Sequence, residues 1–452
     1  MAGALHGPDV AISSVVTDSR EARGGALFFA LPGARQDGRR FVAEARHQGA
    51  AGAVMEGRPV GGLPSIVVRD AGRALLELAA TERDALSAIV IGITGSVGKT
   101  TTKDFAAGVL ATRLRAHASP ASFNNQVGVP LTVLGADPST LALVCEIGAG
   151  EVGEIAALCR VARPTIGVVT AVGMAHLETF GSLANIARAK AELVRSLPSD
   201  GLAILNADDP VVSGFARHSR APVLMFGRSP RAGVRAREVI LDGDARPSFV
   251  LSFEGRSCPV RLSVPGEHMV TAALAASTCG LACGLSLEEC ARGLGGASTS
   301  PGRMSVHDTG GIRILDDSYN ANPISMHAAL RTARAVGGRR RLVAVLGTMA
   351  QLGPASRSEH ERIGRLAAQL RVDELIAVGE EARWIAAAAI AEGLSASAGR
   401  GAADADEALD SLTTLEPGDL VLVKGSRVVG LERFVAGLRA RTVPGREEVV
   451  PA

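Results

Sequence analysis

Aromatic side chains are scarce in this sequence: they make up 3% of its 452 residues, with a single Trp and a single Tyr. Hydrophobic residues still account for 47% of the chain. The cores must therefore be built from Ala, Val, Leu and Ile, which suffices for ordinary α/β packing. A chain of this length should contain about two to four domains.

The sequence also has few cysteines, a low net charge and no long apolar run. The six cysteines lack the spacing of a metal site, and Cys279, Cys283 and Cys290 lie in an alanine-rich stretch where we expect buried apolar residues. A formal net charge of +2 gives no reason to expect a nucleic-acid partner, and the basic run at 339–341 is interpreted as a solvated helix end. No apolar run reaches about 18 residues and no signal peptide is evident, so we expect a cytoplasmic protein without a membrane partner.

What the sequence does contain is a glycine turn between an apolar run, residues 89–93, and a helical pattern. In such a turn, backbone N–H groups and the helix dipole face an anion, Lys99 adds a positive charge and Thr100 can bind Mg²⁺. The strict P-loop spacing fails, because Ile93 stands where the first glycine belongs. The position between strand and helix nevertheless predicts a nucleoside triphosphate ligand. The predicted phosphate-binding residues are Thr94, Gly95, Ser96, Val97, Gly98, Lys99, Thr100 and Thr101.

The order of the expected elements predicts an α/β fold with three domains. Residues 1–86 form a small α/β unit with four expected strands. In the second unit, near-continuous apolar strands alternate with helices, which indicates a parallel sheet covered on both faces; residues 248–264 are typical of a β-hairpin. In the third unit, each expected strand ends near a glycine, where open α/β sheets admit ligands. The predicted domains are residues 1–86, 87–301 and 302–452.

Three further residues are candidates for metal or phosphate chemistry. Glu146 ends the apolar run 141–145, in the same sheet as the phosphate turn, where a carboxylate can hold Mg²⁺ beside phosphates. His176 follows the expected strand 166–172, and Lys190 lies in an expected helix. On residue chemistry alone, His176 is more often a packed or surface histidine than a ligand, and Lys190 is expected to be a surface lysine.

Short motifs along nearly the whole chain, taken together and in order, resemble the ATP-dependent Mur ligases. The motifs are residues 92–103, 123–130, 146–149, 176–190, 206–209, 301–303 and 315–323. Within that family, residues 316–323, 347–353 and 423–427 are similar to the branch that adds D-alanyl-D-alanine to UDP-N-acetylmuramoyl-tripeptide. The Asp-Asn-Pro-Arg run of the diaminopimelate-adding branch is absent.

The resemblance implies a UDP-binding N-terminal domain, a central P-loop ATPase-type domain with an added hairpin, and a Rossmann-like C-terminal domain. It implies an acyl-phosphate mechanism that uses ATP and two Mg²⁺ ions. By similarity, Lys99, Glu146, His176 and Lys190 are catalytic. Thr100 and Glu146 would hold the first ion, and His176 and Lys190 would belong with the second. Because an ammonium group repels Mg²⁺, Lys190 is expected to be carbamylated.

The resemblance also implies binding residues in all three domains. The expected uridine diphosphate segment is Thr17, Asp18, Ser19 and Arg20, and the substrate-facing asparagines are Asn124 and Asn125. The expected nucleotide contacts outside the phosphate turn are Asn206, Arg303, Asp317, Tyr319, Asn320 and Asn322. The expected binders of the dipeptide carboxylate are Lys424, Ser426 and Arg427. We expect catalysis to need domain closure, and we expect a monomer.

One segment departs from the family pattern. Where family members usually have His-Asn-x-x-Asn-Ala, this chain has His268, then Met269 and, three positions later, Ala272. Both asparagines are missing, including the one expected to contact adenine. Either other groups hold adenine, such as Asn206 or residues 319–322, or the affinity for the nucleotide is weaker.

Two alternatives remain open. One is a ligase that adds a single amino acid, of the diaminopimelate-adding or folylpolyglutamate type; residues 1–86 count against the folate type. The other is a non-catalytic ATP-binding protein that regulates a partner. The retention of Lys99, Thr100, Glu146, His176 and Lys190 counts against this second alternative, because a decayed site should lose its metal ligands.

Overall fold

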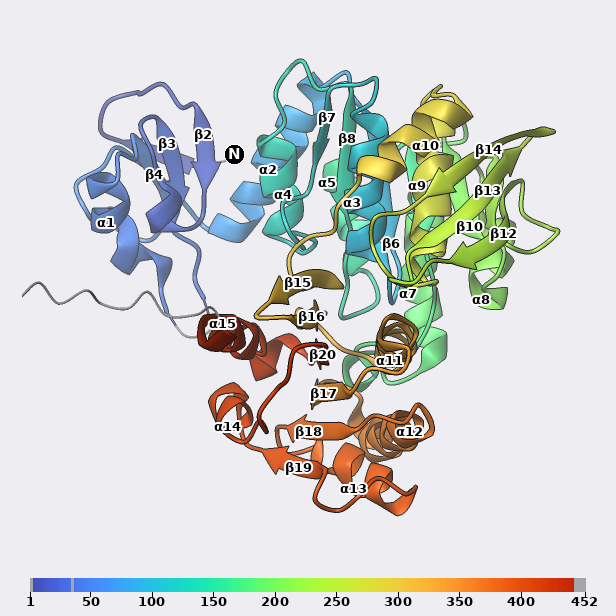
Figure 1. Cartoon of the computed structure of the whole chain (residues 1–452). Helices are drawn as coiled ribbons and strands as arrows, with labels where there is room; N and C mark the ends of the chain where they lie inside the picture. The colour runs from blue at the N-terminus through green and yellow to red at the C-terminus, as the bar shows by residue number, and fades with distance from the viewer. Residues whose placement is uncertain (1–2, 34–35, 443–452) are drawn as a thin grey trace, which may run out of the picture.

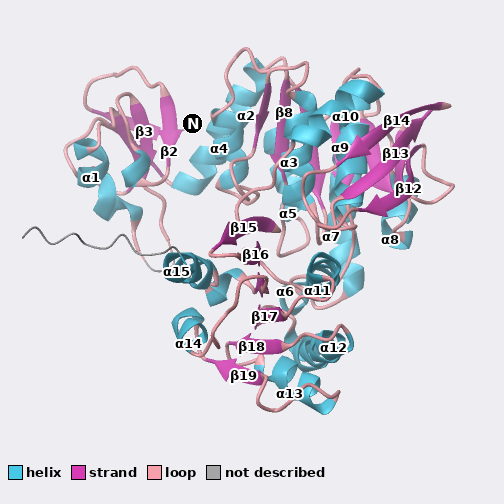
Figure 2. Ribbon diagram, in the orientation of Figure 1, coloured by secondary structure: helices cyan, strands magenta, loops and turns pink. Residues whose placement is uncertain are grey.

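The computed structural model describes residues 3–33 and 36–442, which are arranged around three β-sheets (Figures 1 and 2). The N-terminal sheet lies beside the central one, and the C-terminal sheet lies below both in this view. All three sheets are mainly parallel, which confirms the predicted α/β class. The outer ends of the first and last predicted domains, residues 1–2 and 443–452, lie outside the described residues. Among the helices of the described chain, none combines the length and the apolar character needed to cross a bilayer.

The N-terminal sheet has the strand order β1-β5-β4-β3-β2, with only β1 antiparallel to its neighbour. β3 is fully buried and forms the centre of two small apolar cores, one on each face. Its elements are β1 Gly3–His6, β2 Ser14–Val16, η1 Ser19–Glu21, β3 Ala26–Phe29, η2 Gly38–Phe41, α1 Val42–His47, β4 Gly52–Glu56, β5 Ser65–Val68 and α2 Ala71–Ala85.

Helix α2 belongs to the cores of two sheets. Ala71, Ala74 and Leu75 pack under the N-terminal sheet, whereas Ala79 packs with the core of the central sheet. Asp70 caps its N-terminus by accepting a 2.8 Å hydrogen bond from the backbone N–H of Arg73. The helix therefore joins the N-terminal sheet to the central sheet.

The central sheet has nine strands in the order β14-β13-β12-β11-β10-β9-β6-β8-β7. Helices α3, α9 and α10 cover one face, and α4, α5 and α7 cover the other. Strands β6 to β12 are parallel, and the predicted hairpin, β13 and β14, extends the sheet antiparallel. The strands are β6 Ile89–Thr94, β7 Ala116–Ala118, β8 Ala142–Glu146, β9 Ile166–Val169, β10 Leu202–Asn206, β11 Val223–Gly227, β12 Val234–Leu241, β13 Pro247–Phe253 and β14 Arg256–Arg261. The helices are α3 Lys99–Leu110, α4 Gly128–Leu134, α5 Glu154–Ala162, α6 Leu177–Phe180, α7 Leu183–Ser196, α8 Pro210–Ser213, η3 Gly214–His218, α9 Met269–Ala282 and α10 Leu287–Gly296.

The C-terminal sheet has the order β15-β16-β20-β17-β18-β19, with β15 alone antiparallel. Helices α11, α12 and α13 cover one face, and α14 and α15 cover the other (Figure 1). The strands are β15 Ser305–Thr309, β16 Ile312–Asp316, β17 Leu342–Gly347, β18 Glu374–Val378, β19 Gly399–Ala402 and β20 Leu420–Lys424. The helices are α11 Pro323–Gly337, η4 Gly353–Ala355, α12 Ser356–Gln369, α13 Arg383–Ala391, α14 Ala405–Asp410, η5 Arg427–Val429 and α15 Glu432–Thr442.

The basic run at 339–341 is a solvated helix end in its first two residues: Arg339 and Arg340 are exposed just after α11, whereas Arg341 is half-buried and has another role. Helix α11 ends at Gly337, and Arg341 leads directly into β17. The guanidinium of Arg341 donates hydrogen bonds of 2.6 Å to Glu374 and 2.7 Å to Asp419, whose carboxylates are almost fully buried. Arg341 therefore ties together the starts of β17, β18 and β20.

Candidate active site

The phosphate turn lies between β6 and α3, as the sequence predicted. Gly95 (φ 153°) and Gly98 (φ 79°) adopt positive φ angles that favour glycine. A Cβ on Gly95 would lie 2.0 Å from Oγ1 of Thr170, so only glycine fits there. Thr170 also donates a 2.6 Å hydrogen bond to the carbonyl of Val97. The segment after β9 thus fixes the shape of the turn.

Two side chains from the start of α3 face this turn. Lys99 donates a 2.8 Å hydrogen bond to the carbonyl of Gly95, and burial lowers the pKa of its amine, an effect that nearby Glu146 opposes. Thr100 is 3% exposed, and its hydroxyl lies 3.2 Å from Oγ of Ser122 and accepts a 3.0 Å hydrogen bond from Arg303. Arg303 comes from the segment that precedes the C-terminal sheet, so this segment contacts the turn. Ser122 was not among the predicted site residues.

Glu146, at the end of β8, is 1% exposed. Asn124 donates a 2.7 Å hydrogen bond to its Oε1, whereas its buried Oε2 has no hydrogen-bond partner among the described residues. The described residues contain no cluster of three or more His, Cys, Asp or Glu side chains suited to a metal. One carboxylate with a free oxygen and one hydroxyl, Thr100, match the way Mg²⁺ binds together with substrate phosphates. These oxygen ligands therefore fit a Mg²⁺ ion.

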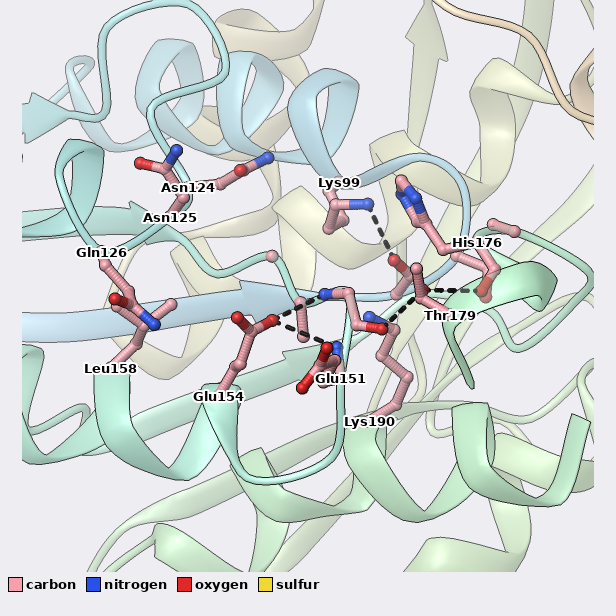
Figure 3. A pocket seen from close by; sticks show the side chains of 16 residues that line it. Lys99, Asn124, Asn125, Gln126, Glu151, Glu154, Leu158, His176, Thr179 and Lys190 are labelled. Carbon is pink, nitrogen blue, oxygen red and sulfur yellow. Dashed lines mark hydrogen bonds between the residues drawn. The ribbon is translucent and has the colours of Figure 1, made fainter. Parts of the chain in front are cut away.

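A cavity of about 350 Å³ opens beside the turn. Figure 3 shows Lys99 and His176 on its upper side and Glu154 and Lys190 on its lower side, with Asn124 at its left. The cavity therefore brings together residues that are far apart in the sequence. Among its lining residues that were not predicted are Gln126, Glu151, Glu154 and Thr179.

Lys190 projects from α7 and is 3% exposed. Its Nζ lies 5.6 Å from the centre of the Phe180 ring and has no hydrogen bond or ion pair within the described chain. Burial, assisted by the positive charge of Lys99, lowers the pKa of the Lys190 amine to about 7. A large fraction of the amine is therefore neutral near pH 7.

His176 follows β9 and lines the same cavity. Its backbone is left-handed, with φ 55°, and burial lowers the pKa of its imidazole, which favours the neutral ring. Its Nδ1 is hydrogen-bonded to Oε1 of Gln351, a residue of the C-terminal part of the chain. The sequence analysis did not identify Gln351.

The loop between β8 and α5 forms one wall of the cavity, and two carboxylates hold it in place. Glu154 accepts hydrogen bonds from the backbone N–H groups of Gly150 (2.7 Å) and Glu151 (3.1 Å) (Figure 3). Glu192, from α7, accepts from Gly153 (2.6 Å) and Ala156 (3.0 Å) at the start of α5. Carboxylates in these positions satisfy N–H groups at a helix N-terminus. The loop is thus tied to the helix that carries Lys190.

The C-terminal candidates meet around Tyr319 and Asp317. The centre of the Tyr319 ring lies 4.2 Å from the guanidinium carbon of Arg303 and 5.7 Å from that of Arg427. Asp317 accepts hydrogen bonds from the N–H of Met304 (3.1 Å) and from Nζ of Lys424 (2.5 Å). Lys424 is 2% exposed. Its ammonium is therefore paired with Asp317 inside the protein.

Several predicted binding residues use their polar groups within the chain. Asn125 accepts from the N–H of Gly128 (2.9 Å), Asn322 caps α11, Asn206 donates to the carbonyl of Thr170 (2.8 Å), and Ser426 accepts from the N–H of Ala350 (2.8 Å). The side-chain oxygen of Asn320 accepts from the N–H of Ala321. Thr94 is buried, and Thr101 is half-buried on α3. Met269 and Ala272 are 3% and 6% exposed, so the first turn of α9 offers no polar side chain at either position.

The predicted uridine diphosphate segment lies after β2, outside the cavity. Asp18 and Arg20 form an ion pair of 2.5 Å, and the hydrogen bonds from Arg20 lower the pKa of Asp18 to about 2. Ser19 donates a 2.7 Å hydrogen bond to Glu44. Thr17 is half-buried.

Comparison with known proteins places this geometry in a family. The model of the Mur ligase family catalytic domain matches residues 11–79, that of the Mur ligase middle domain matches 93–280, and that of the Mur ligase glutamate ligase domain matches 302–427. The UDP-N-acetylmuramoyl-tripeptide–D-alanyl-D-alanine ligase of Mycobacterium bovis is 44% identical, over 92% of this chain and 90% of that protein. The ligase of the same name from Escherichia coli is 34% identical, over 97% and 96%.

Solved structures give the same result. The MurF crystal structure from Acinetobacter baumannii superimposes with a TM-score of 0.85 at 32% identity, covering 97% of this chain and 96% of that one. MurF from Thermotoga maritima, solved in complex with ADP, gives a TM-score of 0.81 at 28% identity, covering 95% and 97%. The resemblance noted in the motifs is thus confirmed along almost the whole chain, and the chain belongs to the Mur ligase family.

Proposed function

We propose that this protein is an ATP-dependent ligase that joins D-alanyl-D-alanine to UDP-N-acetylmuramoyl-tripeptide in peptidoglycan precursor synthesis. The observation that supports it most is the cavity beside the phosphate turn, which Lys99, Asn124, His176 and Lys190 line together. Relatives with this activity in their names match 92% and 97% of the chain. With ATP and a nucleotide-linked substrate, the enzyme would work in the cytoplasm, and we propose that one chain forms the complete site.

The reaction requires activation of a carboxylate, which is a poor electrophile. An oxygen of the tripeptide carboxylate bonds to the γ-phosphorus of ATP, and the bond from that phosphorus to ADP breaks. The amine of D-alanyl-D-alanine then attacks the acyl carbon, phosphate leaves, and the amine loses a proton. Negative charge develops on the phosphoryl oxygens in the first step, so fixed positive charges at the turn accelerate it.

The residues of this chain supply several of these charges. Lys99, at the start of α3, donates to the carbonyl of Gly95 in the turn, and Arg303 donates to the Thr100 hydroxyl from the segment before β15. Backbone N–H groups of the turn and the positive end of the α3 dipole attract the phosphates in addition. We assign Thr100 and Glu146 to one Mg²⁺ ion, and His176 and Lys190 to a second. When bound, these ions neutralise the charge that builds up on the phosphoryl oxygens.

We further propose that Lys190 is carbamylated. Its neutral amine adds to carbon dioxide, forming an N–C bond and releasing one proton, which leaves an anionic carbamate. Two observations support this: the amine is buried without a hydrogen bond or ion pair in the described structure, and it lines the same cavity as His176. A carbamate supplies the oxygen ligands that Mg²⁺ prefers.

The proposal is tested by phosphate release from ATP in the presence of UDP-N-acetylmuramoyl-tripeptide. The reaction is run with D-alanyl-D-alanine, with L-lysine, with diaminopimelate and without an amine. We expect release with D-alanyl-D-alanine only. Release with a single amino acid would identify the single-residue-adding alternative, and no release in any arm would favour a regulatory ATP-binding protein.

A further inference from the structure

Gln351 joins the C-terminal part of the chain to the candidate metal site. It lies 175 residues from His176, and its side-chain Oε1 is hydrogen-bonded to His176 Nδ1. A second hydrogen bond, of 3.1 Å, runs from the backbone N–H of Glu178 to the carbonyl of Gln351. The two hydrogen bonds therefore form a two-point contact between the segment after β9 and the loop after β17.

The loop that presents Gln351 is firmly attached to the C-terminal sheet. The N–H of Met349 donates a 2.9 Å hydrogen bond to Nε2 of His360, which is completely buried. The N–H of Ala350 donates a 2.8 Å hydrogen bond to Oγ of Ser426. Gln351 is the next residue, so its position follows that of the C-terminal sheet.

Both partners have an unusual backbone. His176 has φ 55° and Gln351 has φ 62°, in the left-handed region that non-glycine residues seldom occupy. Such conformations persist only where the surroundings hold them, and they are concentrated at functional sites. Here the two left-handed residues face each other across the same contact.

The hydrogen bond determines which nitrogen of the His176 ring carries the proton. An amide oxygen can only accept, so Nδ1 must be the donor. In a neutral imidazole, Nε2 then keeps its lone pair, on a ring that lines the cavity. A histidine that binds a metal through one nitrogen commonly has its other N–H fixed in this way.

We propose that Gln351 is a positioning residue that holds His176 in the Nδ1-protonated tautomer, so that Nε2 is available to a divalent cation only when the C-terminal part is seated. The identity of the cation as the second Mg²⁺ rests on the proposed function. Gln351 does not line the cavity. Its effect is therefore transmitted entirely through His176.

The first test measures the tautomer in the full-length protein without metal or substrates. Histidine is labelled with ¹⁵N, and the His176 signals among the nine histidines are assigned with the His176→Asn variant. At pH 8 we expect the Nδ1-protonated tautomer in the wild type and in Gln351→Glu, because a carboxylate accepts the same hydrogen bond. Gln351→Ala and Gln351→Gly should shift His176 toward the Nε2-protonated tautomer.

The variants separate the side-chain contact from backbone strain. Glycine relieves the left-handed strain at position 351 and alanine does not, but both remove the hydrogen bond. If strain mattered, the two variants would differ. Gln369→Ala is the matched control, because Gln369 in α12 donates a 3.0 Å hydrogen bond to Glu392 on the protein surface. An unchanged His176 tautomer in Gln351→Ala, or an Nε2-protonated wild type, overturns the proposal.

The second test is the dependence of phosphate release on Mg²⁺ concentration. Loss of a partner that orients a metal ligand typically costs about 10- to 100-fold in metal affinity or activity. We expect Gln351→Ala and Gln351→Gly to raise the half-saturating Mg²⁺ concentration by that factor, with KM for D-alanyl-D-alanine little changed. Gln351→Glu should stay near the wild type. An unchanged Mg²⁺ requirement in Gln351→Ala contradicts the positioning role. If no substrate gives phosphate release, the proposed function fails, but the tautomer measurement still decides the role of Gln351.

Discussion

Asn124 donates a 2.7 Å hydrogen bond to Oε1 of Glu146 and leaves Oε2 of that buried carboxylate without a partner. The amide thus fixes the orientation of the carboxylate. Orienting a ligand in this way is how residues next to a metal site tune affinity. Asn124 also lines the cavity itself.

We expect Asn124→Ala to lower kcat by about 10- to 100-fold and to raise the Mg²⁺ concentration needed for half-maximal rate. The reason is that Glu146 loses the hydrogen bond that aims its free oxygen. The measurement is phosphate release over a Mg²⁺ titration. Asn185→Ala is the control, since Asn185 makes an amide hydrogen bond of the same length, 2.7 Å, to the carbonyl of Phe180 outside the cavity. Equal Mg²⁺ curves for the two variants would argue against a role for Asn124.

Lys190→Ala should abolish ligase activity, because the cavity loses the carbamate that we propose. High chloride or short carboxylates such as acetate should restore part of the rate by entering the space left by the side chain. The measurement is phosphate release with and without these anions. Rescue by anions supports the carbamate, and a fully active Lys190→Ala enzyme refutes it.

The stability of the metal-free enzyme should depend on pH through Lys190. The pKa of this amine is about 7 in the folded chain, against a usual value of 10.5. Between these values the unfolded chain binds more protons, so stability rises with pH, by about 2 kcal/mol from pH 7 to 9 for this group alone. Lys190→Met should lack this increase. Urea unfolding in carbon dioxide-free buffer measures the difference between the two proteins. Parallel pH profiles would show that the amine is not desolvated.

Recognition of adenine should be weak in this enzyme. Met269 and Ala272 offer no hydrogen bonds, and the alternative groups that we considered, Asn206 and the 319–322 segment, already use much of their hydrogen-bonding capacity within the chain. We expect a raised KM for ATP and a kcat/KM ratio for ATP over GTP on the order of 10, rather than the 10⁴ that a hydrogen-bonding pocket gives. Tight selectivity that disappears in Met269→Ala or Ala272→Gly would contradict this expectation.

The parts of the fold that could be predicted are those with local signals. The apolar run before Gly95 became β6, and the two apolar runs joined at Gly255 became the β13–β14 hairpin. Strand β12 was missed, because six of its eight residues are partly or fully exposed and Glu238 interrupts it with a left-handed backbone. Without β11 and β12, the connection between the parallel strands and the hairpin could not be drawn from sequence.

The same distinction holds for the candidate site: residues with a local sequence signal could be predicted, and residues defined by long-range contacts could not. Residues in a recognisable turn or at a strand end, such as Lys99 and Glu146, could be named from sequence. Gln351 and Ser122 could not, because their roles depend on contacts with His176 and Thr100 that only the folded chain creates. Lys424 was expected to face a ligand; that role stays a prediction, but the structure pairs its ammonium with Asp317, a partner 107 residues away. Motif position reveals which elements meet, but not which charges are already neutralised within the chain.

Helix α2 has a consequence for substrate choice. Because α2 packs into the cores of both sheets, the N-terminal sheet cannot rotate freely relative to the phosphate turn. If the segment from Thr17 to Arg20 grips the nucleotide end of a long substrate, the span from that grip to Lys99 is constant. The enzyme would then select substrates by length. It would accept a peptide stem that spans this distance and reject shorter or longer ones, without contacting every residue in between.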